Sequence, residues 1–78
     1  MKATEFVQER DLAVLAKKFR LAAGRTRADA ARDMGIKHPS IFHAEESPEK
    51  PFCKLRKRMI ETYSPFKVVG PIYWLEKK

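Results

Sequence analysis

Side chains that can donate and accept hydrogen bonds gather in a short stretch of the chain, at His38, Ser40 and His43. The two histidines are five residues apart, whereas paired metal ligands on one helix face are usually four apart, so we expect no metal site. No paired carboxylates and no nucleophile beside a base stand out. Each histidine could also be an ordinary surface residue. The chemistry that this stretch predicts is recognition by hydrogen bonding, with no catalysis and no cofactor.

The charge of the chain narrows the choice of partner. Its 78 residues include 17 Lys and Arg against 10 Asp and Glu, which gives a formal net charge of +7. A field of this sign on a small body attracts polyanions, so DNA, RNA and anionic membrane surfaces are all candidates. Charge by itself does not choose among them.

Size and cysteine content set the class of protein. A chain of 78 residues has room for one domain and one modest core, so we expect a single domain over 1–78. The one cysteine, Cys53, has no partner for an internal disulfide, which favours a reducing compartment. No apolar run is long enough for a signal peptide or a bilayer span. We therefore expect a cytoplasmic protein that needs no membrane and no small-molecule ligand.

Apolar periodicity and helix stop signals predict four helices. A first helix begins between Thr4 and Arg10 and ends at Gly24. Its apolar face is made of six residues: Leu12, Leu15, Ala16, Phe19, Ala22 and Ala23. A second helix starts at the N-cap Thr26, with Asp29 three residues later, and ends at Gly35. A third has Pro39 in its first turn.

A loop over 46–51 precedes the fourth helix, which presents Phe52, Leu55, Met59 and Tyr63 on one face. We expect its cations to form a solvated face: Lys54, Arg56, Lys57 and Arg58.

The C-terminal tail over 66–76 has β-branched and aromatic residues, and Gly70-Pro71 interrupts it. It predicts two short extended segments around a bend. They could form a hairpin on their own domain, remain a disordered extension, or pair with a second subunit. We favour the third, with a dimer interface at Val68, Ile72, Tyr73 and Trp74.

The second and third helices have the residues that two closely crossing helices need. Ala31 is small at the crossing point, Gly35 relieves the turn, and Ile36, Ile41 and Ala44 supply apolar contacts after it. Phe42 is either a core residue or an exposed one.

The stretch from Gly24 to Glu45 resembles the helix-turn-helix of phage Cro and repressor proteins, and the likeness extends back to Leu12. It is carried by six residues that fall in register together: Thr26, Ala31, Gly35, Ile36, Ile41 and Glu45. Lys37 stands where the family often has Ser or Thr, and His38 where it often has glutamine. These departures leave the preferred DNA sequence open.

The resemblance implies a mainly α, four-helix, lambda-repressor-like domain with a short C-terminal β segment and a helix-turn-helix over 26–45. It also implies an ion pair between Arg20 and Glu45. Together with the hydrogen-bonding capacity of the third helix, it predicts DNA contacts at nine residues: Arg25, Thr26, Arg27, Lys37, His38, Pro39, Ser40, Phe42 and His43.

The function expected from these features is sequence-specific binding of double-stranded DNA to regulate transcription, as a homodimer at a palindromic operator. A different class remains open, an antitoxin that binds a protein toxin and regulates its own operator. The sequence does not distinguish a repressor from an activator.

Overall fold

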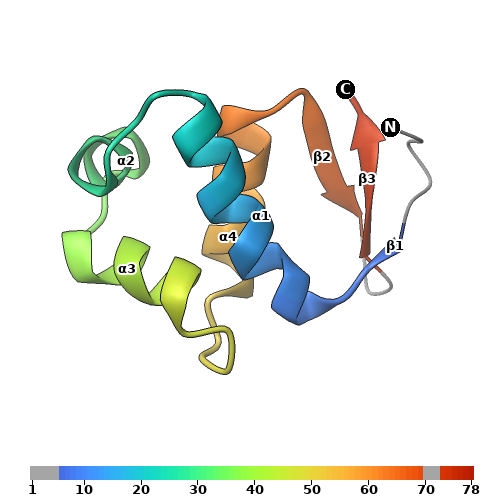
Figure 1. Ribbon diagram of the computed structural model, residues 1–78, viewed down its shortest axis with the longest axis horizontal. Helices are drawn as coiled ribbons and strands as arrows, with labels where there is room; N and C mark the ends of the chain where they lie inside the picture. The colour runs from blue at the N-terminus through green and yellow to red at the C-terminus, as the bar shows by residue number, and fades with distance from the viewer. Residues whose placement is uncertain (1–5, 70–72) are drawn as a thin grey trace.

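In the part of the chain that the structure describes, four helices form from the middle, and short strands form from both ends (Figure 1). The computed structural model describes residues 6–69 and 73–78. Its elements are β1 (Phe6–Val7), α1 (Glu9–Ala22), α2 (Arg27–Met34), α3 (His38–Glu46), α4 (Cys53–Tyr63), β2 (Phe66–Val69) and β3 (Tyr73–Lys77). The predicted fold class, mainly α with a short C-terminal β segment, is confirmed.

The first helix begins at the late end of the predicted range. Gln8 is its N-cap, and the Asp11 carboxylate accepts a hydrogen bond from the Gln8 backbone N–H at 2.9 Å. The helix ends at Ala22, two residues before Gly24. Ala22 and Ala23 are exposed, so their placement on the apolar face was wrong.

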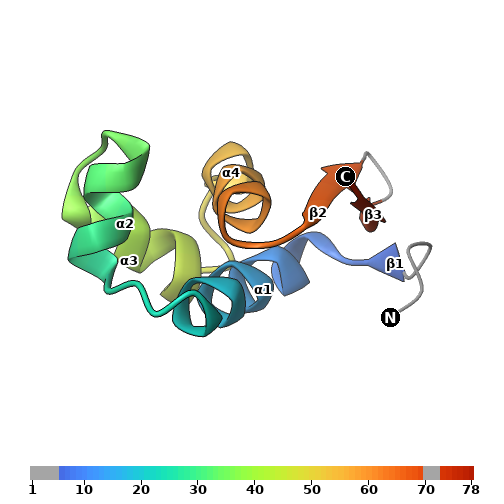
Figure 2. The ribbon, with the colours of Figure 1, turned by 90° about the horizontal axis from the view of Figure 1, so that it is seen from above.

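The core lies where α1, α3 and α4 meet, and small residues of α2 close one side of it. Seven of its apolar side chains are completely buried: Leu12, Ala16, Ala30, Ile41, Ala44, Met59 and Ile60. Figures 1 and 2 show α1 and α4 between the α2–α3 pair at one end and the strands at the other. The core therefore joins two ends that differ in structure.

The tail pairs within its own chain. β3 is the central strand of a three-stranded antiparallel sheet with the order β1-β3-β2. Its register places Phe6 opposite Trp74 on one side and Val69 opposite Trp74 on the other. Of the three arrangements considered for the tail, the structure therefore has the hairpin on its own domain, extended by a strand from the N-terminal end.

This pairing corrects part of the predicted dimer interface. Val68 is only 7% exposed and packs in the protein's own core, because β2 lies against α4. The backbone of Tyr73 and Trp74 belongs to β3, and Ile72 lies outside the described residues.

The outer edge of β2 is also occupied by groups of the same chain. Alternate residues of an edge strand turn their N–H groups away from the sheet. The Val68 N–H donates to Glu61 Oε2 at 3.2 Å, and the Phe66 N–H donates to Ser64 Oγ at 3.1 Å. Side-chain acceptors on an edge oppose pairing with a second chain.

Candidate nucleic-acid interface

The turn between α2 and α3 has the geometry that its sequence predicts. The Asp29 N–H donates to Thr26 Oγ1, and the Thr26 N–H donates to Asp29 Oδ2, both at 3.0 Å, which completes a capping box. At the other end of α2, Gly35 has a φ of 67° in the left-handed region, which an L side chain rarely adopts. Ala30 and Ala31 are buried between the helices, as expected for a close crossing.

One side of α3 is fixed in the core. Ile41 and Ala44 are fully buried, and Pro39 stands in the first turn, where its missing N–H costs nothing. Lys37 is the N-cap and supplies no side-chain hydrogen bond. The buried side of this helix therefore determines which of its side chains face solvent.

The opposite side of α3 is open to solvent near its N-terminus. His38 and Pro39 are exposed, and Phe42 is 43% exposed, which settles the alternative left open for this residue. Ser40 is only half-buried, at the side facing α4. Three of the five predicted contact residues on α3 are thus exposed.

His43 is less accessible than the sequence suggested. Its Nδ1 lies 3.3 Å from Ser47 Oγ, and its ring stacks on Phe52 with centroids 6.2 Å apart. The Phe42 ring meets it edge-on at 5.6 Å. These contacts hold the imidazole beside the loop that leads to α4.

The ion pair expected between Arg20 and Glu45 is present and buried. Arg20 Nε lies 2.5 Å from Glu45 Oε2, and Nη2 lies 3.0 Å from Oε1. Arg20 Nη1 also donates to the Arg25 carbonyl at 2.6 Å. A two-pronged guanidinium–carboxylate pair in a buried setting fixes orientation, so it joins α1 to the end of α3.

Arg27 extends this pair into a network. Its Nε lies 3.0 Å from Glu45 Oε1 and its Nη2 lies 2.5 Å from Glu46 Oε2, while its guanidinium lies 5.0 Å from the centre of the Phe42 ring. Lys17 Nζ approaches the same Glu46 oxygen at 2.8 Å. Arg27 is therefore held by two carboxylates of α3, and its direct effect is to position that helix.

Arg25 is also held within the protein. It makes two hydrogen bonds to the Asp33 carboxylate, at 3.1 and 2.9 Å, and the Tyr63 hydroxyl donates to Asp33 Oδ2 at 2.6 Å. The Arg25 hydrogen bond lowers the pKa of Asp33. Burial, aided by the hydrogen bond to Asp33, raises the pKa of Tyr63 to about 12.

Arg56 was wrongly placed on the solvated face of α4, since it is fully buried. Its Nε donates to the Ala44 carbonyl at 2.8 Å and its Nη2 to the Ser47 carbonyl at 2.7 Å. The last carbonyls of a helix have no partner within the helix and are acceptors for a nearby cation. Helical spacing was the sequence signal that was missed, because Arg56 lies one turn before the buried residues Met59 and Ile60 on the same side of α4.

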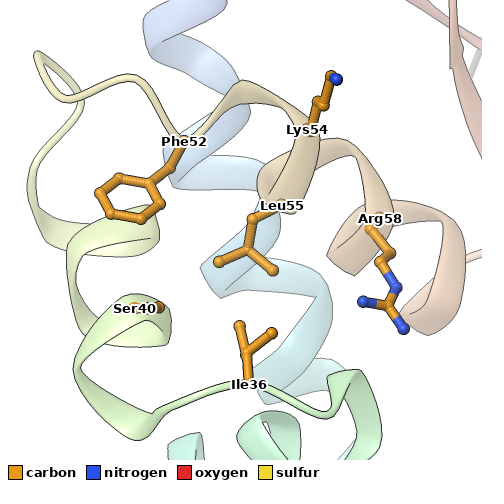
Figure 3. A pocket seen from close by; sticks show the side chains of 6 residues that line it. All are labelled: Ile36, Ser40, Phe52, Lys54, Leu55 and Arg58. Carbon is orange, nitrogen blue, oxygen red and sulfur yellow. The ribbon is translucent and has the colours of Figure 1, made fainter.

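Arg58 makes the equivalent contact at the C-terminal end of α2, where its Nη1 donates to the Met34 carbonyl at 2.9 Å. It lines a hollow of about 300 Å³ between α3 and α4, together with Ile36, Ser40, Phe52, Lys54 and Leu55. Figure 3 shows Leu55 and Ile36 pointing toward each other across it, while Lys54 points away. Two arginines of α4 thus bind the C-terminal ends of both helices of the helix-turn-helix.

Lys37 is the cation of this surface that remains open to a ligand. It is exposed at the start of α3, and within residues 6–69 and 73–78 its side chain makes no hydrogen bond or ion pair. Thr26 is exposed at the start of α2 with its hydroxyl already accepting from Asp29. A partner would first meet Lys37, Thr26 and the exposed N-terminal turn of α3.

Comparison with known proteins identifies no relative: no family model, no curated protein and no solved structure matches this chain. No helix among the described residues has the length and apolar character needed to cross a bilayer.

Proposed function

We propose that the chain binds double-stranded DNA by placing α3 in the major groove, and that it regulates transcription by occupying an operator. The observation that carries this proposal is the arrangement of α3. One side of it is fixed by the core and by buried ion pairs, while His38, Pro39 and Phe42 project from its N-terminal half. A rigid helix with an exposed N-terminal half is what major-groove recognition requires.

The exposed side chains suit base edges. His38 can donate or accept a hydrogen bond, and the half-buried Ser40 hydroxyl can do the same from the side of the helix. The Phe42 ring, held beneath the Arg27 guanidinium, offers an apolar surface to a thymine methyl group. His43 contributes through its packing against Phe42, which steadies that ring.

The phosphate contacts come from groups beside the helix. Lys37 supplies an unpaired ammonium, and the Thr26 hydroxyl can donate its proton to a phosphate oxygen while it accepts from Asp29. Arg25 and Arg27 are partly neutralised by their carboxylates, so they contribute less than their charge suggests. The net charge of +7 adds the long-range attraction.

A homodimer remains part of this proposal, because two recognition helices one DNA turn apart would read a palindromic site. Because β3 already pairs with β1 and β2 of its own chain, the two subunits of a dimer would have to meet through another surface.

Salt titration of DNA binding tests the division between phosphate and base contacts. Lys37→Ala should weaken binding to all duplexes and reduce the slope of log K against log salt by about 0.9, the value for one lost phosphate contact. Lys77→Ala is the matched control, because Lys77 is exposed and belongs to β3, which lies at the other end of the molecule from α3 (Figure 1). His38→Ala should instead change which duplexes are preferred. Equal effects of Lys37→Ala and Lys77→Ala would contradict the proposed orientation of α3.

A further inference from the structure

Large exposed apolar side chains are few in the described part of the chain, and two of the three lie on α1. Val14 is 66% exposed and Leu21 is 58% exposed, while the third, Phe42, belongs to the α3 surface. Residues seven apart in a helix lie on the same side of it, so Val14 and Leu21 form one strip. Figure 2 shows α4 on one side of α1 and no helix on the opposite side.

This strip borders a groove of about 540 Å³ between α1 and the end of α3. Its lining consists of Val14, Lys17, Lys18, Leu21, Glu45 and Glu46. The ion pair between Lys17 and Glu46 lies along the groove and neutralises Glu46. The groove therefore offers an apolar strip with rigid walls, because α1 and α3 are joined by the buried Arg20–Glu45 pair.

The charges beside the strip select the kind of partner. Arg10 and Lys18 stand on the same side of α1 as Val14, at helical spacing, and both are exposed. If two copies packed strip against strip, Lys18, which lies midway between Val14 and Leu21, would face the same residue of the other copy, which opposes association. A partner with acidic side chains would instead gain from the same cations. Charge complementarity thus favours a different, acidic chain over a second copy of this one.

We propose that the groove along α1 binds an acidic amphipathic helix of a partner protein, with two apolar residues one heptad apart and Asp or Glu beside them. Its apolar residues would cover Val14 and Leu21, and its carboxylates would meet Lys18 and Arg10. This inference does not depend on DNA binding, and it defines a surface that an antitoxin or a regulator could use.

The test uses a designed peptide and the whole ¹⁵N-labelled chain. The peptide is alanine-based and about 18 residues long to favour a helix, with two leucines one heptad apart and glutamates on either side of them. NMR titration should show saturable shifts confined to amides of α1 and to Glu46. A peptide with lysines in place of the glutamates is the charge control and should bind at least about tenfold more weakly.

Variants separate the apolar and charged contributions. Val14→Gln combined with Leu21→Gln leaves the charge unchanged and should weaken the acidic peptide at least about tenfold. Lys18→Glu should weaken it more than Lys77→Glu, a matched change far from the groove. DNA binding by the glutamine double variant, whose charge is unchanged, should stay at the wild-type level, and Lys18→Glu and Lys77→Glu should weaken it equally through the lower net charge.

Three results would overturn the proposal. The first is no saturable shift with the acidic peptide, and the second is equal binding of the lysine peptide. The third is concentration-dependent self-association of the wild type that the glutamine variant abolishes, since that would identify a second copy as the occupant. Failure of DNA binding by the wild-type chain would affect only the proposed function.

Discussion

The two ends of this small protein are held together by different interactions. At one end, α2 and α3 are joined to α1 and α4 by charged groups as well as by buried apolar residues, with Glu45 buried between Arg20 and Arg27. At the other end, β1, β2 and β3 are joined by backbone pairing, and Val68 and Leu75 pack in the core. Charged pairs fix direction, whereas apolar contact adds stability without directional preference. The difference indicates that the helical end is built for precise placement of α3.

The largest expected effect concerns the carboxylate at the centre of the helical end. Glu45→Gln leaves Arg20 buried without a charged partner, and its cost to the free energy of unfolding should be about 3–5 kcal/mol. Replacing both Arg20 and Glu45 by methionine removes the buried charges together and should cost less than the single change. Urea unfolding measures both. A double variant that is less stable than Glu45→Gln would show that the pair does not act as a unit.

Arg56 gives the second largest expected effect. Arg56→Met keeps the length of the side chain but leaves the Ala44 and Ser47 carbonyls without their donor, at a cost of about 2 kcal/mol. Lys54→Met is the matched control on the exposed side of the same helix and should change stability by no more than about 0.5 kcal/mol. If the two substitutions cost the same, then the hydrogen bonds from Arg56 add nothing to the packing of α4.

A change at the sheet end should cost less and leave α3 in place. Deletion of residues 1–7 removes β1 and exposes one edge of β3, at a cost of about 1 kcal/mol for the lost backbone pairs. Hydrogen exchange should speed up at β3 but not in α2 or α3, and self-association should increase through the exposed edge. Faster exchange at α3 as well would show that the two ends are coupled.

The smallest expected effect appears only at extreme pH, at the contact of Asp33 with Arg25 and Tyr63. The pKa of Tyr63 is raised from 10.0 to about 12, so the stability gained from its neutral phenol is complete below pH 10 and is lost as pH rises toward 12. The pKa of Asp33 is lowered from 3.8, so its contribution is present above that pH and is lost as pH falls through the lowered pKa.

Asp33→Asn should lower the pKa of Tyr63, though not back to 10.0, because burial is the larger cause. Phenolate absorbance against pH measures this shift, and Tyr63→Phe assigns the signal. The stability of Asp33→Asn should also vary less with pH on the acid side. An unchanged titration of Tyr63 would contradict the hydrogen bond between the two side chains.

The difference between the ends also explains what the sequence could predict. Signals for α2 and α3 are local: a capping residue, an acidic partner three residues on, and a glycine at the turn. Thr26, Asp29 and Gly35 occupy the positions expected for them. The sheet depends on pairing between Phe6 and Trp74, which no local pattern encodes, and the tail alone was compatible with several arrangements.

Side-chain partners were the other feature that the sequence did not give. Arg27 was expected to meet a phosphate, but two carboxylates of α3 lie within its reach once the helices are packed. Arg56 was expected in solvent, but the chain turn after α3 brings two carbonyls to it. In both cases the sequence identified a cation, but its partner depends on how the helices cross.

The most direct test of the account is selection of bound duplexes from a random DNA pool at near-physiological salt, with the wild type and with His38→Ala beside it. The account predicts a motif for the wild type, with two half-sites if the protein binds as a dimer, and an altered motif for the variant at the positions that α3 reads. Enrichment of no motif, with binding that disappears as salt rises, would contradict the proposal and leave only nonspecific attraction to a basic surface.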